Sequence, residues 1–224
     1  MGQRSQDLDA LLALGVFVRR GVIEPDLCRD LRSAARVADH EKATIVRDAG
    51  GSVVDERHRR TRSVDIPHPS AQVVSRRIAA LGGELSGYFD VDLSGCQETQ
   101  FLLYRRGDFF RAHADNSGAQ NLEEYIRLRQ ISVVVFLSDQ ASRPTEDAYC
   151  GGELRFFMLD RHATAAKART SVRGEAGLVV AFRSHTFHEV APVSFGERLT
   201  AVTWMVGPRS PGSPVRAARA AAPG

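Results

Sequence analysis

The stretch GLVVAFRSHTFHEVAPVSFGERLTAVTWMVG, residues 177–207, alternates apolar runs with short polar turns. Runs of about four to eight residues rich in Val, Thr, Phe and Trp, bounded by Gly, Pro or Ser, are typical of strands, so this stretch predicts three of them. The pattern begins at Glu98, and five earlier segments share it: TQFLLYRR, DFFRAHAD, RQISVVVFLSD, GGELRFFML and TSVRG. Many short strands with no long helical period between them predict a β-sandwich or β-barrel.

The first 96 residues have a different pattern, in which apolar residues recur at helical spacing. Helices are predicted over residues 25–40, where a proline suits the first turn, and over residues 69–88. Residues 43–66 are predicted to form a hairpin around an AGG turn, and the charged segment 53–63 is a candidate lid over a substrate. The predicted fold class is therefore α+β, mainly β, with N-terminal helices that buttress one face of a β-rich body.

Length and composition suit one globular domain. The chain has 224 residues, of which 43% are hydrophobic and 25% are charged. A single domain is predicted over residues 1–207, with helical and hairpin support from residues 1–96 and a β core over residues 97–207. Residues 208–224 are poor in bulky apolar side chains and are predicted to form a disordered tail.

The sequence shows neither a membrane span nor a secreted scaffold. No apolar run approaches the roughly 20 residues that cross a bilayer, and the N-terminus lacks the basic start and long apolar block of a secretory signal. A cytoplasmic protein with no membrane association is therefore predicted. The three cysteines, Cys28, Cys96 and Cys150, are scattered and form no CxxC pair, which predicts free thiols.

The chain is basic, with a net charge of +3 and a pI of about 9.0, and nearly all of the positive charge is arginine. An arginine excess can indicate nucleic-acid binding. Here acidic residues are interspersed with the arginines, and no long basic stripe occurs outside VDERHRRTR at residues 54–62. Nucleic acid is therefore disfavoured as a partner.

His113 and Asp115 are candidate metal ligands. Residues two apart on a strand project to the same face, so one imidazole and one carboxylate would be aimed together into the β-rich body. An HxD pair alone is weak support for a metal site. The third ligand has to come from one of three distant histidines: His162, His185 or His188. His188 is favoured because it precedes a predicted hairpin that carries Arg198, whereas His185 would face the opposite way on a regular strand.

Two imidazoles and one carboxylate leave adjacent coordination positions open. This suits non-haem iron(II) that binds a bidentate co-substrate and dioxygen, although zinc accepts the same ligands. Arg198 adds a distinction, because a buried guanidinium requires an anion and its fork matches a carboxylate. Thr200 shares a strand face with Arg198 and is a candidate second donor. The alternative for Arg198 is a surface salt bridge with Glu197 or another acid.

Four segments in order resemble the prolyl-4-hydroxylase-type iron(II)- and 2-oxoglutarate-dependent oxygenases. YRRGDFFRAHAD (104–115) resembles the family's Y-x-x-G-x-[FY]-x-x-x-H-x-D segment, and RQISVVVFLSD (129–139) resembles the strand that follows it. CGGELRFF (150–157) resembles the G-G-E-L segment, and residues 177–204 resemble the closing block with the distal histidine and the basic residue. The resemblance covers about residues 100–206, and several ordered motifs are far more specific than any one of them.

The resemblance implies a double-stranded β-helix core, also called a jelly roll or cupin-like fold. It implies three iron ligands: His113, Asp115 and His188. It also implies that Arg198 binds the distal carboxylate of 2-oxoglutarate and that Tyr104 lies in the same pocket. Relatives often have a tyrosine where Phe136 stands, so Arg198, helped by Thr200, has to hold that carboxylate without the tyrosine hydroxyl. Relatives that halogenate lack the carboxylate of Asp115, so hydroxylation is the implied outcome.

The implied activity is a dioxygenase that hydroxylates an unactivated C–H bond and releases succinate and carbon dioxide. The implied cofactors are iron(II), 2-oxoglutarate and dioxygen, with ascorbate as a candidate stimulant. The implied substrate is a prolyl or other amino-acid residue in a protein or peptide, or a small molecule derived from an amino acid. Two alternatives stay open: a nucleic-acid demethylase with the same iron chemistry, and a non-catalytic metal-binding jelly-roll sensor. The sequence also leaves open the substrate, the hydroxylated position and the oligomeric state.

Overall fold

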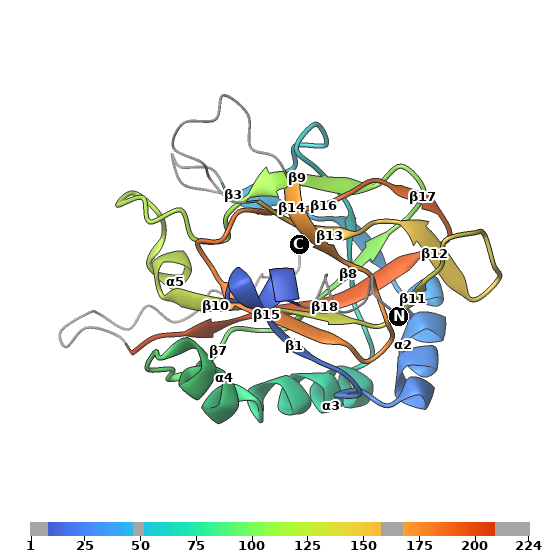
Figure 1. Ribbon diagram of the computed structural model, residues 1–224. Helices are drawn as coiled ribbons and strands as arrows, with labels where there is room; N and C mark the ends of the chain where they lie inside the picture. The colour runs from blue at the N-terminus through green and yellow to red at the C-terminus, as the bar shows by residue number, and fades with distance from the viewer. Residues whose placement is uncertain (1–8, 47–51, 158–167, 209–224) are drawn as a thin grey trace, which may run out of the picture.

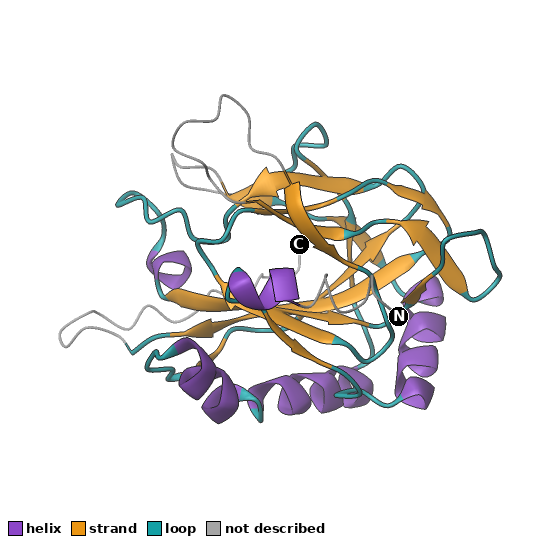
Figure 2. Cartoon of the chain, in the orientation of Figure 1, coloured by secondary structure: helices purple, strands orange, loops and turns teal. Residues whose placement is uncertain are grey.

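Two layers of β-strands form the body of the molecule, and helices lie along the larger layer (Figures 1 and 2). The computed structural model describes residues 9–46, 52–157 and 168–208. His162 and the predicted tail beyond residue 208 lie outside the described residues. The predicted fold class, α+β and mainly β with N-terminal helices, is confirmed.

The larger sheet is antiparallel, and its strands follow the order β1-β15-β10-β18-β8-β6-β2, with β7 paired to β18. Side chains along β10 alternate between its faces, as the period of a strand requires. Ile131, Val133 and Val135 pack with the helices, whereas Val134 and Phe136 pack toward the other layer. The bounds of the strands are Phe17–Arg19 (β1), Val179–Arg183 (β15), Arg129–Phe136 (β10), Arg198–Val206 (β18), Gln100–Tyr104 (β8), Arg62–Val64 (β6), His40–Lys42 (β2) and Gly95–Cys96 (β7).

The second layer is built from the smaller sheets. A five-stranded antiparallel sheet follows the order β14-β13-β16-β9-β5, with bounds Ala168–Val172 (β14), Leu154–Phe157 (β13), His188–Val190 (β16), Phe109–His113 (β9) and Arg59–Arg60 (β5). A three-stranded sheet continues it with Asp139–Gln140 (β11), Ala148–Gly151 (β12) and Val193–Phe195 (β17), and a two-stranded pair joins Ile45–Val46 (β3) to Ser52–Val53 (β4). In β9 and β16, His113 stands opposite His188, so this register brings two distant histidines together.

Three helices pack on one face of the larger sheet: Pro25–Val37 (α2), His68–Ala79 (α3) and Gly82–Phe89 (α4). Leu31 of α2, Ile78 of α3 and Leu85 of α4 are fully buried in one cluster with the apolar face of β10. Burial of such side chains stabilises each helix by about 1.5–3 kcal/mol per side chain. A short helix, Glu124–Arg127 (α5), lies between β9 and β10. No described helix is long and apolar enough to span a membrane.

The helix predicted over residues 69–88 is wrong in one respect, because two helices occupy this region. The first ends at Ala79 and the second begins at Gly82. Ala80 and Leu81 form the turn between them, and Gly82 and Gly83 begin the second helix, where glycine costs about 1 kcal/mol relative to alanine. The break lets each helix follow the twisted sheet with its own apolar face. The three cysteines are free thiols, as predicted.

We expect Gly151→Ala to lower the free energy of unfolding by about 2–4 kcal/mol. Gly151 has a φ of +72°, and an added Cβ would lie 2.4 Å from the carbonyl oxygen of Pro192. Gly83→Ala in α4 is the matched control, because a Cβ there meets no atom within 4 Å. The control should leave stability unchanged or raise it by up to about 1 kcal/mol. Urea unfolding of both variants measures the difference, and equal effects would contradict the prediction.

Candidate active site

His113, Asp115 and His188 form one cluster between the two layers. The potential ligand atoms of the three side chains all lie within 4.8 Å of one another. Nε2 of His113 lies 3.5 Å from one carboxylate oxygen of Asp115, and Nε2 of His188 lies 3.7 Å from the other. The three side chains therefore aim their donor atoms at a common point.

Backbone carbonyls fix the orientation of both imidazoles. Nδ1 of His113 lies 2.8 Å from the carbonyl oxygen of Arg111, and Nδ1 of His188 lies 2.9 Å from that of Thr186. A neutral imidazole that donates from Nδ1 keeps a lone pair on Nε2, and this tautomer is the one that a metal ion requires. The backbone thus presents both Nε2 atoms to the cluster as acceptors.

Ser132 orients the carboxylate of Asp115. Its hydroxyl is fully buried and donates to Oδ2 of Asp115 at 2.6 Å, and the hydroxyl of Ser184 lies 3.0 Å from it. Sequence reasoning did not single out Ser132, although it is the one polar residue in the buried run ISVVVF. A single hydroxyl on the inward face of an apolar strand was the signal available, because a buried polar group needs a partner.

The protonation states of Asp115 and His188 favour the binding of a cation. Burial would raise the pKa of the Asp115 carboxyl, but His188, His113 and the hydrogen bond from Ser132 hold that pKa well below its ordinary range. Burial, and then the charge of His113, lowers the pKa of His188 from 6.5 to about 4. At neutral pH Asp115 is therefore ionised and His188 is neutral. This donor set fits a divalent metal ion such as iron(II) or zinc.

Acid should destabilise the metal-free protein in a defined window. Because the pKa of His188 is about 4 in the folded chain and 6.5 ordinarily, the unfolded state binds more protons between these values. The free energy of unfolding should fall as the pH falls from 6.5 to about 4, by on the order of 3 kcal/mol at 1.36 kcal/mol per pKa unit. Denaturant unfolding of chelator-treated protein measures this loss. His188→Gln should flatten the slope in that window, and an unchanged slope would contradict the assignment.

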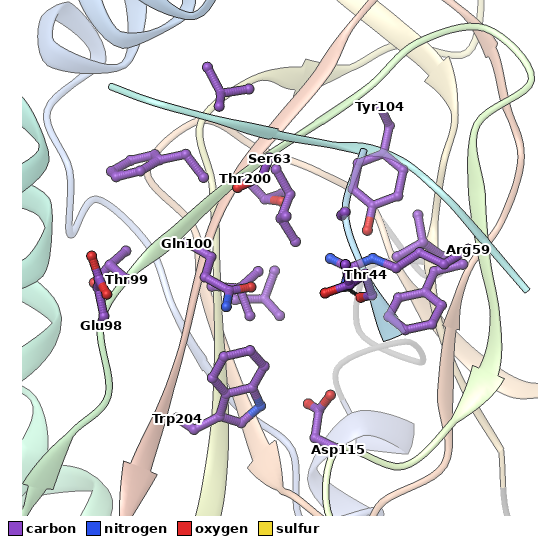
Figure 3. Close-up of a pocket in the computed structure, with 18 of the residues that line it drawn as sticks. Thr44, Arg59, Ser63, Glu98, Thr99, Gln100, Tyr104, Asp115, Thr200 and Trp204 are labelled. Atoms are coloured by element: carbon purple, nitrogen blue, oxygen red, sulfur yellow. Dashed lines mark hydrogen bonds between the residues drawn. The ribbon is translucent and has the colours of Figure 1, made fainter. Parts of the chain in front are cut away.

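A cavity of about 1250 Å³ opens from this cluster, and Figure 3 shows part of its lining. Arg198, Tyr104 and Thr200 line it together with the three clustered residues. Arg198 is 1% exposed and Thr200 is fully buried. The guanidinium carbon of Arg198 lies 5.0 Å from the ring centres of both Tyr104 and Phe136. The predicted co-substrate residues are thus gathered on one wall of the cavity.

Arg198 has no anionic partner among the described residues. Its Nη1 lies 3.5 Å from the hydroxyl of Thr200, and its buried Nε and Nη2 have no hydrogen-bond partner there. The alternative of a surface salt bridge with Glu197 is wrong, because Glu197 pairs instead with Arg36 and Arg105. A buried guanidinium with two unsatisfied donors is costly, so the cavity is built to receive an anion at this point.

Two details differ from the geometry expected for the cluster. Asp115 lies just beyond the end of β9 rather than on it. His185 is exposed in the turn between β15 and β16, so it is excluded from the cluster by a turn and not by the alternation of a regular strand. His188 begins the next strand and points inward, opposite His113.

Residues 99–206 match the family model described as the 2OG-Fe(II) oxygenase superfamily. The chain is 32% identical over 105 residues to a PKHD-type hydroxylase of Shewanella sp. strain ANA-3, which covers 47% of this chain and 41% of that protein. It is 36% identical over 75 residues to a PKHD-type hydroxylase of Sphingopyxis alaskensis, covering 34% of this chain and 28% of that protein. The chain therefore matches about two fifths, or less, of the length of these curated relatives.

Two solved structures share the fold. A Pseudomonas putida prolyl-4-hydroxylase superposes with a TM-score of 0.63 at 22% identity, covering 92% of this chain and 99% of that chain. A Trichoplax adhaerens prolyl hydroxylase in complex with a hypoxia inducible factor peptide fragment gives a TM-score of 0.62 at 14% identity, covering 92% and 89%. These likenesses confirm the predicted double-stranded β-helix core. Residues 99–206 thus match the 2OG-Fe(II) oxygenase superfamily, and the chain has the fold of the prolyl-4-hydroxylase structures.

Proposed function

We propose that the protein is an iron(II)- and 2-oxoglutarate-dependent dioxygenase that hydroxylates an unactivated C–H bond. The observation that supports this most strongly is the presence of two complementary sites in one cavity. One is the His113–Asp115–His188 cluster, whose donors suit iron(II). The other is Arg198, a buried cation without an anion. A metal-binding sensor would have no use for the second site, and the likeness to hydroxylases favours hydroxylation over nucleic-acid demethylation.

The residues of the chain divide the work between them. His113, Asp115 and His188 would hold iron(II), and Arg198, with Thr200 beside it, would bind the distal carboxylate of 2-oxoglutarate. Bound iron(II) and 2-oxoglutarate together supply the oxidising chemistry, with dioxygen as the oxidant and succinate and carbon dioxide as products.

The protein itself orients the candidate metal ligands and lines the cavity partly with apolar side chains. Ser132 holds Asp115 in one rotamer, and the carbonyls of Arg111 and Thr186 hold the imidazoles. Apolar side chains form part of the cavity lining, and a substrate that displaces water from them would strengthen the electrostatic interactions of the cluster. These apolar side chains include Val134, Leu154, Val190 and Val202. Tyr104 lies 2% exposed beside Arg198 and closes one side of the co-substrate wall.

The substrate that we propose is a prolyl or other amino-acid residue in a protein or peptide, or a small molecule derived from an amino acid. Its support is that two of the structures with this fold are prolyl hydroxylases, one of them bound to a peptide fragment. Ascorbate as a stimulant, the cytoplasmic location, the single-domain bounds and the lid role of residues 53–63 stay predictions.

Succinate release from 2-oxoglutarate tests the proposed function. The purified protein is assayed with iron(II), dioxygen and a panel of proline-containing peptides, amino acids and methylated oligonucleotides. We expect release to depend on iron(II) and to rise with a peptide or an amino acid. Activity with zinc but not with iron(II) would contradict the proposed oxygenase function. Stimulation by methylated oligonucleotides alone would favour the nucleic-acid demethylase.

A further inference from the structure

Besides Arg198, two arginines line the same cavity: Arg59 and Arg129. Arg59 lies on β5, and its guanidinium carbon is 4.7 Å from the ring centre of Phe110. Phe110 in turn stacks on His113 with ring centres 3.6 Å apart and planes 20° apart. Nη1 of Arg59 donates to the carbonyl oxygen of Thr44 at 2.8 Å, while its buried Nε has no hydrogen-bond partner among the described residues. The stack places Arg59 one aromatic ring away from the cluster.

Arg129 begins β10 and lies flat on Trp204. Its guanidinium carbon is 3.5 Å from the centre of the indole ring and 5.6 Å from that of Tyr125. Its Nε donates to the side-chain oxygen of Gln97 at 2.9 Å. Trp204 lines the cavity with it, and its buried indole N–H has no hydrogen-bond partner in the described part of the chain. The rings of Trp204 and Tyr125 and the side chain of Gln97 thus hold the Arg129 guanidinium in place. No other hydrogen bond from this guanidinium is seen in the described part of the chain.

Neither arginine forms a salt bridge within residues 9–46, 52–157 and 168–208, although other arginines of the chain do. Arg62, for example, lies 2.9 Å from a carboxylate oxygen of Asp108. Burial lowers the pKa of the Arg129 guanidinium, Asp115 raises it, and the positive charge of Arg59 lowers it again. Both guanidinium groups line the same cavity, so it holds two like charges. Like charges held together in a cavity attract an anion.

The charges of the cavity define where that anion would sit. Iron(II) and the carboxylate of Asp115 sum to about +1, and 2-oxoglutarate with Arg198 sums to about −1, so these four groups cancel. Arg59 and Arg129 then add two positive charges to a lining that also carries Lys42 and four further acidic residues, which are Asp39, Glu41, Asp65 and Glu98. Glu98 lies on the opposite side of the cavity from Arg59 and Asp115, as Figure 3 shows, so an anionic group would be turned away from Glu98 and toward the arginines.

We propose that Arg59 and Arg129 form a subsite for a carboxylate of the substrate, beside the carbon that reacts. The inference rests on the proposed function and narrows its substrate to a molecule with a free carboxylate. That carboxylate is either the α-carboxylate of an amino-acid-like molecule or the side chain of an acidic residue in a peptide. Charge-assisted hydrogen bonds from a planar guanidinium would hold it in one orientation.

Pairs of probes that differ only in this carboxylate test the subsite. The first pair is N-acetyl-L-proline and N-acetyl-L-prolinamide, and the second is acetyl-Asp-Pro-amide and acetyl-Asn-Pro-amide. Each is titrated by calorimetry into the full chain saturated with manganese(II) and 2-oxoglutarate, and into the metal-free chain. The proteins are the wild type, Arg59→Gln, Arg129→Gln and the matched control Arg60→Gln. Arg60 lies on the same strand, stacks on Phe109 at 5.8 Å and does not line the cavity.

We expect the wild type to bind the acid of at least one pair about tenfold to a hundredfold more tightly than its amide, as a charged hydrogen bond provides. Arg59→Gln should reduce this preference by about tenfold, and Arg60→Gln should keep it. Preference within the first pair identifies an amino-acid-like carboxylate, and preference within the second identifies an acidic peptide residue. Equal affinity or no binding of acid and amide in both pairs would overturn the subsite, as would full preference in both Arg59→Gln and Arg129→Gln.

The design separates two failures. If manganese(II) and 2-oxoglutarate do not bind, the proposed function fails, while titration of the metal-free chain still tests Arg59 and Arg129. If both bind and the wild type shows no preference for the carboxylate, only the subsite fails. Thermal unfolding of each variant shows whether it is folded, and Arg59→Gln and Arg129→Gln serve as independent tests if either one is not.

Discussion

Arg198→Ala should weaken the binding of 2-oxoglutarate by about two to four orders of magnitude. The wild-type guanidinium is 1% exposed and has two donors without a partner among the described residues, so the distal carboxylate would meet a cation that is already desolvated. Loss of one partner from a buried charge pair costs about 3–5 kcal/mol, which gives this range at 1.4 kcal/mol per decade. Thr200 alone offers one neutral hydroxyl and cannot replace a charge.

Paired titrations of iron(II) and 2-oxoglutarate into the wild type and the variant measure this effect. Binding of iron(II) should survive, because His113, Asp115 and His188 are untouched. Arg105→Ala is the matched control. Arg105 pairs at 3.0 Å with Glu197, the residue directly before Arg198, and Arg105 does not line the cavity. Unchanged affinity for 2-oxoglutarate in Arg198→Ala would show that the anion binds elsewhere.

His188→Ala should lower the affinity for iron(II) by more than the 10- to 100-fold that loss of a supporting residue typically causes. His188 supplies one of three donors that lie within 4.8 Å of one another, and two donors cannot hold a divalent ion against water. His185→Ala provides a control of the same chemistry, since His185 is exposed in the preceding turn. Anaerobic titration with iron(II) compares the two variants. Loss of affinity in His185→Ala, with binding retained in His188→Ala, would reverse the assignment.

Much of the fold could be predicted because the spacing of apolar residues along each segment indicates whether it forms a strand or a helix. Strand β10 alternates Ile131, Val133 and Val135 with Ser132 and Val134, and this period shows without any knowledge of the partner strands. The break between α3 and α4 was missed although Gly82 and Gly83 mark it. The apolar period runs on through both helices, and tertiary packing on a twisted sheet decided that the chain should turn.

The candidate site was predictable to the extent that a motif carries it. His113 and Asp115 are close enough in the sequence to be recognised, and His188 and Arg198 lie ten residues apart. The hairpin predicted to join His188 to Arg198 is wrong, because β16 and β18 belong to different sheets. Ser132, Arg129 and Trp204 could not be found in this way. Their roles depend on which strands become neighbours, and β10 lies beside β18 only through a register that links residues far apart in the chain. The unsatisfied donors of Arg198 are likewise a property of the packed cavity and not of the sequence around it.

The pairing of His113 with His188 across β9 and β16 has a consequence for the stability of the smaller sheet. An ion bound by both histidines would link residues 113 and 188, which are far apart in the sequence, and it would do so only in the folded state. By mass action the ion would then stabilise that sheet, whereas helices α2, α3 and α4 already support the larger one. Amide hydrogens of β9 and β16 should therefore exchange faster after chelation, while those of β10 and β18 keep their protection. The metal ion would then stabilise the pairing of β9 with β16 in addition to its role in the reaction.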